Sequence, residues 1–197
     1  MQTFKKISII GCGAGLLLFG GSVASAAVKS KASCAERTAT IVSSDSVIYG
    51  TESSDVIVVT GSGAHTVQAL GGNDVICGSN AADMIYGGHG NDRIDGRGGD
   101  DIVSGDLGDD VLLGNNGDDD LSGGDGRDYI FGLNGDDEVT GGVGDDVILG
   151  GNGDDQLAGD DGVDLIIGGT GSDRLLTEPS VDIVFDKEPS GFAFRAK

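Results

Sequence analysis

The sequence predicts an all-β fold, a parallel solenoid in which short strands coil at 18 residues per turn. Two observations predict it. An aspartate stands at every ninth position from Asp74 to Asp182, and an aliphatic residue follows two positions after each of these aspartates. Glycines recur five and two positions before most of them. A nine-residue period held this strictly is neither a helical nor a coiled-coil period, so every turn must repeat one backbone shape.

The repeating unit is G-x-x-G-x-D-x-U-x, where U is aliphatic. Glycines supply the positive φ angles that tight turns need and that other residues resist. The residues x-U-x are expected to form a short strand in which U faces inward and its two neighbours face outward. Two units then make one coil, with a strand on each side, a turn at each edge and a thin aliphatic core between two parallel sheets.

Carboxylates are expected to stack along the turn edges, with Asp74 above Asp92 on one edge and Asp83 above Asp101 on the other. Like charges at strand spacing repel each other unless a cation lies between them. A hard divalent cation meets this need, because carboxylates of successive turns and turn carbonyls together make a calcium site. The candidate calcium ligands are Asp74, Asp83, Asp92, Asp101, Asp110, Asp119, Asp128, Asp137, Asp146, Asp155, Asp164 and Asp173.

Several stretches match a longer motif, G-G-x-G-x-D-x-U-x, throughout, among them residues 87–95 (GGHGNDRID) and residues 150–158 (GGNGDDQLA). This motif resembles the RTX, or haemolysin-type, calcium-binding nonapeptide repeat. The resemblance covers residues 70–185. It implies a parallel β-roll with several calcium ions bound in the turns, each contacted by the sixth-position aspartate and by turn carbonyls.

Some units depart from the motif. The turns before Asp83 and Asp182 lack most of their glycines, so weak or absent calcium sites are expected there. Elsewhere only the second glycine is replaced, which leaves the turn geometry less tightly specified. The replacing residues are Arg97, Asp106, Asn115, Leu133 and Asp160.

The negative charge of the chain lies in the repeats. The net charge is −21, and residues 70–176 hold 25 acidic side chains, 4 arginines and no lysine. Acidic residues usually form a solvated protein surface, but their regular spacing in this chain favours cation binding. Because phosphates would be repelled, the charge argues against nucleic acid as a partner.

Residues 1–26 are interpreted as a secretory signal peptide. Lys5 and Lys6 precede an apolar run, and Ala24-Ser25-Ala26 forms a small-residue cleavage site. The expected location is therefore extracellular, with no membrane span in the mature chain. A second interpretation, a lipoprotein anchored at Cys12, is less favoured because the apolar run continues beyond this residue.

Residues 27–69 are interpreted as degenerate coils that cap the repeats. Asp55 keeps the register, and His65 takes the aspartate position after a slip of one residue. His65 and His89 have no companions at zinc spacing, so both are expected on the surface. Cys34 and Cys77 remain after signal cleavage, and we predict that they form a disulfide between the cap and the first regular coil.

One sheet is predicted to carry an apolar outer face, because its outward residues are apolar from Val111 onwards whereas those of the other sheet are mostly polar. Such a patch often marks an interface. Two interpretations stay open: the C-terminal tail, residues 186–197, folds over it, or a second copy or another protein docks there. The candidate interface residues are Val111, Leu113, Tyr129, Phe131, Val147, Leu149, Leu165 and Ile167.

The sequence thus predicts an exported, non-enzymatic calcium-binding protein in which residues 70–185 fold into a β-roll on binding Ca²⁺. Catalysis is not expected, because the carboxylates are the same in every turn whereas an active site is normally unique. Two alternatives are an extracellular adhesin or matrix component that uses its apolar face to bind a partner, and a repeat module related to secreted hydrolases or toxins. The tail serves either as a cap or as a secretion signal.

Overall fold

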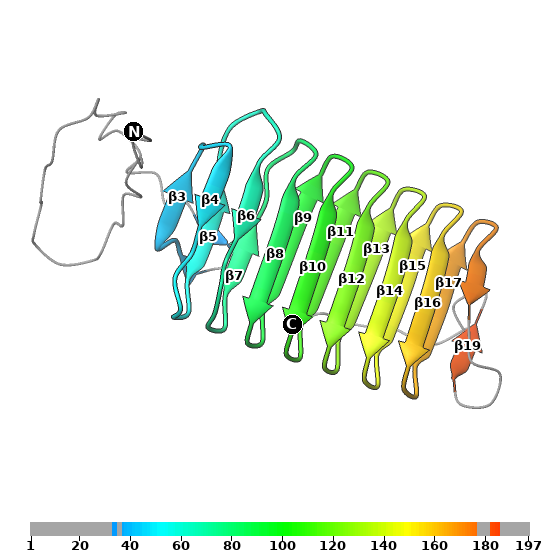
Figure 1. Ribbon diagram of the computed structural model, residues 1–197. Coiled ribbons are helices and arrows are strands. Elements are labelled where there is room, and N and C mark those ends of the chain that lie inside the picture. The colour runs from blue at the N-terminus through cyan, green and yellow to red at the C-terminus, as the bar shows by residue number, and fades with distance from the viewer. Residues whose placement is uncertain (1–32, 35–36, 177–181, 186–197) are drawn as a thin grey trace, which may run out of the picture.

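The computed structural model describes residues 33–34, 37–176 and 182–185 of the 197-residue chain. The described residues form strands and turns and contain no helix. The strands stack side by side into an elongated solenoid, with its first coils at one end and β17 and β19 at the other (Figure 1). The all-β parallel solenoid predicted from the nine-residue period is confirmed.

Alternate strands belong to opposite sheets, and neighbours within each sheet run parallel. The nine-stranded sheet contains β3 (Ile41–Ser43), β5 (Val56–Val59), β7 (Val75–Cys77), β9 (Arg93–Gly98), β11 (Val111–Asn116), β13 (Tyr129–Asn134), β15 (Val147–Asn152), β17 (Leu165–Thr170) and β19 (Ile183–Phe185). The eight-stranded sheet contains β4 (Val47–Tyr49), β6 (Thr66–Gln68), β8 (Met84–His89), β10 (Ile102–Leu107), β12 (Asp120–Asp125), β14 (Glu138–Val143), β16 (Gln156–Asp161) and β18 (Arg174–Leu176).

Each residue of a repeat coil pairs with its equivalent one coil, or 18 residues, away. Leu112 therefore lies between Ile94 and Ile130 in the sheet. The repeat strands are six residues long instead of the predicted three, because ladder pairing continues past x-U-x into the turn residues, as between Asn115 and Leu133. The aspartate itself precedes each strand, at the edge of the sheet.

The core is a single column of aliphatic side chains between the two sheets. Leu112 and Leu121 are 0% exposed, and the same column continues from Ile41 to Ile166. Full burial of one such side chain stabilises the fold by roughly 1.5–3 kcal/mol. The inward position two residues after each aspartate, predicted from the sequence, is therefore the position that builds the core.

A second layer covers the outer face of the nine-stranded sheet at its N-terminal end. There β1 (Ser33–Cys34) pairs with β2 (Arg37–Thr38) in an antiparallel hairpin. Cys34 forms a disulfide with Cys77 of β7, with Cα atoms 5.8 Å apart. A separate hydrophobic cluster lies beneath the hairpin, made of Cys34, Val56, Val58, Val75 and Cys77.

The positions where another residue replaces the second glycine keep the turn geometry. Leu133 has φ 86° and Arg97 has φ 78°, in the left-handed region that their glycine equivalents also occupy. A side chain in this region costs roughly 1–2 kcal/mol, less for asparagine and aspartate. The replacing residues with positive φ are Arg97, Asp106, Asn115, Leu133 and Asp160, with Leu70 in an earlier coil.

Residues 41–68 continue the same two sheets, so the degenerate segment forms coils stacked directly on the repeats. The proposed signal peptide, residues 1–26, and the C-terminal tail, residues 186–197, lie outside the described residues. No helix within the described part of the chain is long and apolar enough to cross a membrane.

Candidate calcium-binding turns

The sixth-position aspartates form a buried hydrogen-bonded ladder along each edge of the solenoid. Asp110 is 0% exposed, and its Oδ1 accepts the backbone N–H of Asp92 at 2.7 Å. Asp110 in turn donates its own N–H to Asp128 Oδ1 at 2.8 Å. The same contact recurs on the other edge, where Asp119 donates to Asp137 at 2.9 Å. One oxygen of each carboxylate thus ties its coil to the preceding one.

The second oxygen has no protein partner in eleven of these aspartates, although it is buried. Leaving a buried polar atom unpaired is costly, and native proteins rarely do so without a ligand, ion or water. The aspartates that share this unpaired Oδ2 are Asp74, Asp92, Asp101, Asp110, Asp119, Asp128, Asp137, Asp146, Asp155, Asp164 and Asp173.

From Asp92 onwards, the unpaired oxygen points toward the first glycine of its own unit. A Cβ placed on Gly105 would collide with Asp110 Oδ2 and would lie 2.6 Å from the carbonyl oxygen of Gly123, in the next coil. A carboxylate oxygen and a carbonyl oxygen therefore converge on a space that only glycine leaves open. This is the chemistry of a calcium donor set, which combines carboxylate and backbone oxygens. The residues present fit the ion that the sequence predicts.

Burial raises the pKa of the turn carboxyls of Asp74 and of the aspartates from Asp92 to Asp164, because removal from water disfavours the charged form. For Asp110 it raises the pKa from 3.8 to about 7, against the backbone N–H of Asp92, which lowers it. The carboxylates one coil away, Asp92 and Asp128, raise the same pKa further. On the opposite edge the pKa of Asp119 is about 7 and that of Asp137 about 6, again chiefly through burial. A cation bound beside these carboxylates would stabilise their charged forms and lower their pKa values again.

A second ladder runs along the rim in the opposite direction. The exposed carboxylate of Asp118 accepts the N–H of Asp136 at 2.9 Å, and Asp136 accepts that of Asp154 at 2.8 Å. Because one Oδ of each rim aspartate holds the next coil, these residues also support the turns. Asp118, Asp136 and Asp154 are all exposed.

No cluster of three or more His, Cys, Asp or Glu side chains suited to a metal occurs within the described ranges. A cation in the turns would therefore be held by aspartates of successive coils together with backbone carbonyls. That donor set is the one proposed from the sequence.

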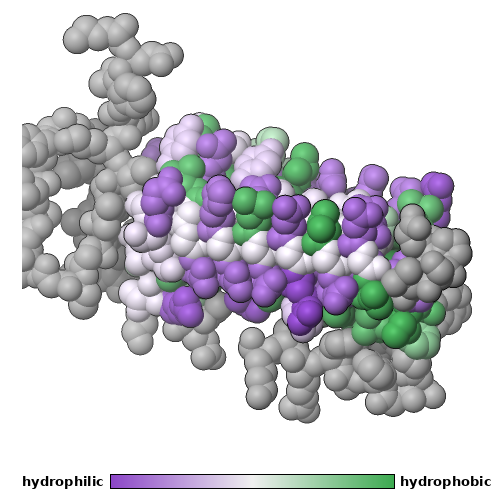
Figure 2. Space-filling view, turned by 60° about the horizontal axis from the view of Figure 1, so that its bottom comes forward, coloured by the Kyte–Doolittle hydropathy of each residue, from purple (hydrophilic) through white to green (hydrophobic). Residues whose placement is uncertain are grey.

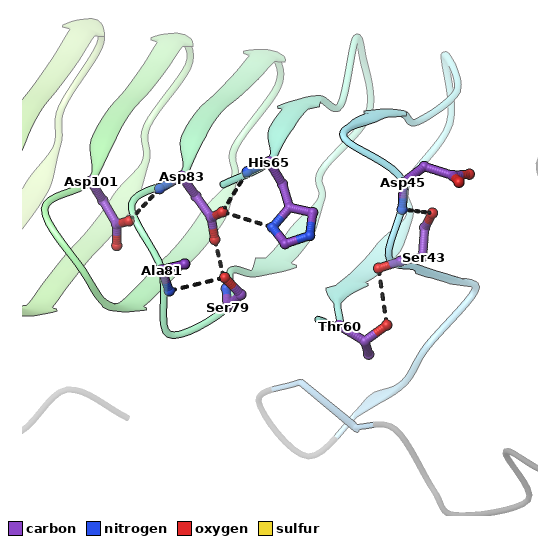
Figure 3. A network of polar contacts seen from close by, with 8 residues as sticks. All are labelled: Ser43, Asp45, Thr60, His65, Ser79, Ala81, Asp83 and Asp101. Atoms are coloured by element: carbon purple, nitrogen blue, oxygen red, sulfur yellow. Dashed lines mark hydrogen bonds and ion pairs between the residues drawn. The ribbon is translucent and has the colours of Figure 1, made fainter. Parts of the chain in front are cut away.

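The turn before Asp83 is built differently from those that follow. Asp83 Oδ2 accepts the N–H of Ser79 at 2.7 Å, whereas its Oδ1 lies 2.9 Å from both the N–H and Nδ1 of His65 (Figure 3). Both oxygens of this carboxylate are therefore occupied by protein groups. Asp83 as a calcium ligand stays a prediction, in the turn where the missing glycines indicated a weak or absent site.

The expectation that His65 lies on the surface is wrong. Its side chain is buried, at 3% exposure, and its ring contacts Asp83. The signal that could have located it is its place in the period, because the aspartate position is buried in every coil. His89, by contrast, is exposed at the end of β8, as expected.

Asp55, at the start of the other edge, also has both oxygens paired. Its Oδ2 accepts the N–H of Thr51 at 2.8 Å and the Thr51 hydroxyl at 2.9 Å. Its Oδ1 accepts the Thr40 hydroxyl at 3.0 Å. Protein donors thus pair both oxygens of Asp55 on one edge and of Asp83 on the other. In the regular repeats, by contrast, the Oδ2 atoms have no protein partner.

The predicted interface residues lie on the outer face of the nine-stranded sheet, as the alternation of strands requires. Tyr129 is 41% exposed, whereas Phe131 is 8% and Ile167 only 1% exposed. Apolar side chains gather at the C-terminal end of the solenoid (Figure 2). An interface with a second copy or another protein stays a prediction. The remaining predicted residues are half-buried: Val111, Leu113, Val147, Leu149 and Leu165.

Comparison with known proteins agrees with this geometry. The chain matches the family model of the RTX calcium-binding nonapeptide repeat at residues 49–84, 59–92, 78–112, 113–148 and 140–175. A search of curated proteins found no match. The matched segments together run from residue 49 to residue 175, which is more than half of the chain, and they include the aspartates with an unpaired oxygen. The chain therefore belongs to the family of proteins built from RTX calcium-binding nonapeptide repeats.

Proposed function

We propose that this protein is an exported calcium-binding β-roll whose repeats fold when calcium enters their turns. The observation that carries the proposal is the eleven buried carboxylate oxygens without a protein partner, repeated along both edges. Ten of them face the first glycine of their unit, where a carbonyl oxygen of the next coil also converges in most repeats; at Asp74 that position is Ala69. A buried array of this kind is costly unless a cation neutralises it.

The glycine and the aspartate of each turn have different roles in the proposed site. The first glycine leaves the space open, and the sixth-position aspartate supplies both a tie to the preceding coil and a free oxygen. Bound calcium supplies the positive charge that lets neighbouring carboxylates stay ionised at strand spacing. The aliphatic column then stacks as each coil is added, so binding and folding are one process.

Without calcium the repeats combine two features that oppose folding. The chain contains 38 glycines, which lose the most conformational freedom on folding. Residues 70–176 also carry 25 acidic side chains against 4 arginines. Dense like charge with little to neutralise it favours a disordered chain. The free energy of calcium binding therefore offsets these two effects and stabilises the folded state of the coils.

We further propose that the protein is non-enzymatic and acts outside the cell. The turn carboxylates are chemically alike from coil to coil, which suits repeated ion binding more than a unique reaction centre. Residues 1–26 have the features of a secretory signal. Extracellular modules work with calcium dissociation constants of roughly 0.1–1 mM, which open, edge-exposed turns can provide.

Far-UV circular dichroism of the mature chain tests the coupling of folding to calcium. Strand signal should be largely lost in chelator and should return on calcium addition. Equal strand content in chelator and in excess calcium would contradict the proposal. Magnesium serves as the control cation, because its stricter octahedral geometry fits carbonyl-rich turns poorly.

A matched pair of variants tests the turn carboxylates directly. Asp137→Asn removes the free buried oxygen yet keeps an acceptor for the N–H of Asp119, whereas Asp136→Asn makes the same change on the neighbouring rim residue. We expect Asp137→Asn to raise the calcium midpoint of folding by about tenfold, which corresponds to about 1.4 kcal/mol. Asp136→Asn should shift it little. Equal shifts would mean that only net charge matters.

A further inference from the structure

We propose that residues 186–197 fold back over the apolar outer face of the nine-stranded sheet and occupy the surface of β13, β15, β17 and β19. The C-terminal segment thereby becomes an intramolecular cover that keeps this face from other molecules. The proposal concerns the sheet face, and it does not depend on what fills the turns.

The surface to be covered consists of two parallel rows of apolar side chains. Register places Tyr129, Val147, Leu165 and Ile183 side by side in one row and Phe131, Leu149, Ile167 and Phe185 in the other. The equivalent rows of the eight-stranded sheet are mostly polar over β12, β14 and β16. An apolar surface of this extent on one side of a solenoid marks a contact surface.

Two residues of the second row are more buried than their neighbours within the sheet explain. Leu149 lies between Phe131 and Ile167 and stays half-buried. Phe131 and Ile167 point the same way and have exposures of only 8% and 1%. Neither belongs to either hydrophobic cluster of the described residues. Such burial of outward-facing side chains is the observation from which we infer a layer above the sheet.

The opposite end of the same sheet already has such a layer. There the outward residues Val56, Val58 and Val75 are buried beneath the β1–β2 hairpin. Between the two ends the face turns polar, at Arg93 and Asp95. The N-terminal apolar patch is therefore covered by a segment that precedes the first coil, and the C-terminal patch calls for an equivalent cover.

The chain that follows β19 has the length and pattern for this cover. Residues 186–197 begin directly after Phe185, and Glu188-Pro189-Ser190-Gly191 is rich in turn-forming residues. Phe192 and Phe194 are two positions apart, so an extended segment would place both on one side. Seven residues from Phe185 to Phe192 can span about 23 Å, whereas three strand steps from β19 to β13 need about 14 Å.

Charge favours the same occupant. The segment carries Lys187, Arg195 and Lys197 against Asp186 and Glu188. It would lie beside repeats that hold 25 acids and 4 arginines between residues 70 and 176. A second copy of this chain would instead bring another acidic solenoid against the first, and that repulsion favours the cover over self-association.

A tryptophan reporter tests the cover, because the chain contains no tryptophan. In the Phe194→Trp protein with calcium we expect blue-shifted emission and loss of acrylamide quenching. Leu149→Asp should restore quenching, whereas Thr140→Asp, at the equivalent position of β14 on the other sheet, should leave it unchanged. Circular dichroism in calcium confirms that each variant is folded, so loss of the cover is distinguished from failure of calcium-driven folding.

Tyr129→Ser provides a milder second variant at an exposed site, in case Leu149→Asp destabilises the fold. It should raise quenching partially. If acrylamide quenches the tryptophan fully in the folded Phe194→Trp single variant, the proposal is overturned. So would a dimer by light scattering whose mass is unchanged by Phe192→Ser with Phe194→Ser, because a second copy would then occupy the face.

Discussion

Asp83 and Asp101 occupy the same edge of the solenoid, one coil apart, and differ in what holds their second oxygen. Asp83 Oδ2 receives the N–H of Ser79, and its Oδ1 also contacts the His65 ring. Asp101 Oδ2 is buried without a partner. One backbone shape thus occurs both with the second carboxylate oxygen paired by protein donors, as at Asp55 and Asp83, and with this oxygen left unpaired, as at Asp101.

The early coils have two further supports that the repeats lack. The disulfide between Cys34 and Cys77 ties the hairpin to β7, and the cluster beneath it adds a second buried layer. Asp74 is the exception in this region, because its Oδ2 is unpaired as in the repeats. The N-terminal coils, residues 37–89, should therefore depend less on calcium than the repeat coils, residues 90–176.

The largest expected contrast between the two regions appears in chelator. Amide hydrogen exchange should stay slow in β3–β8 and should become fast in β11–β17, where the carboxylates lose their cation. We expect a difference in protection of roughly 10⁴-fold, equivalent to about 5.5 kcal/mol. Excess calcium is the control, in which both regions should be protected. If protection were lost equally along the whole chain in chelator, the N-terminal coils and the repeat coils would not differ in their dependence on calcium.

Acidification should produce the next largest effect, mainly in the repeats, with Asp74 as the one carboxyl of the N-terminal coils that shares the raised pKa. The pKa values of Asp101 and Asp110 are about 7 in the folded state against an ordinary 3.8, because burial disfavours their charged forms. The folded state therefore binds more protons than the unfolded state between about pH 4 and pH 7. This stabilising contribution is complete below about pH 4 and is lost as the pH rises through about 7.

Strand content in calcium-free buffer should accordingly rise as the pH falls from 7.5 to about 5, which circular dichroism can follow. In calcium the sign reverses, because protons compete with the ion for the same carboxylates. Calcium affinity should fall over the same range. A calcium-free repeat region that loses structure on acidification would contradict the burial of neutral carboxyls.

Loss of the disulfide should weaken the N-terminal coils selectively. On the loop-entropy model, a closure of 43 residues contributes about 4 kcal/mol. Cys34→Ser with Cys77→Ser should lower the free energy of unfolding of this region by about that amount, measured by denaturant titration in calcium. Hydrogen exchange in β13–β17 should be unaffected. Two free thiols in the purified protein, seen by mass spectrometry, would rule the disulfide out.

The smallest predicted effect concerns backbone strain in the repeats. Leu133 holds a positive φ of 86°, where its neighbour in the ladder is Gly151. Leu133→Gly should stabilise the calcium form by about 1 kcal/mol, since relief of strain outweighs the added flexibility of the unfolded chain. Gly151→Leu is the matched control and should destabilise, because its Cβ would collide with the carbonyl oxygen of Leu133. Thermal unfolding in calcium measures both.

Much of the fold could be predicted because the information is local and repeated. The inward aliphatic, the buried aspartate and the positive-φ turn each recur at a fixed place in the unit, so one physical argument applies to every coil. Even the non-glycine turns followed the register, as Arg97 and Leu133 show with their positive φ. Stacking of identical coils enforces the shape where the local residue disfavours it.

The turn contacts of the early coils could not be predicted in the same way. His65 looked like a surface residue because no zinc-type companion stands near it in sequence. Its partner, Asp83, is 18 residues away and reaches it only through the stacking of two coils. The pairing of Asp83 Oδ2 with Ser79 likewise depends on a turn without the usual glycines, whose conformation the period does not specify.

The sequence by itself determined the coil length, the two sheets, the inward aliphatic column and the carboxylate at each turn, because a strict nine-residue period leaves one side chain orientation per position. Only the tertiary structure decided which carboxylate oxygens are paired, since their donors come from neighbouring coils. It also decided that Phe131 and Ile167 are buried although they point outward. Periodicity specifies where a side chain points, but its surroundings depend on segments distant in sequence that pack against it.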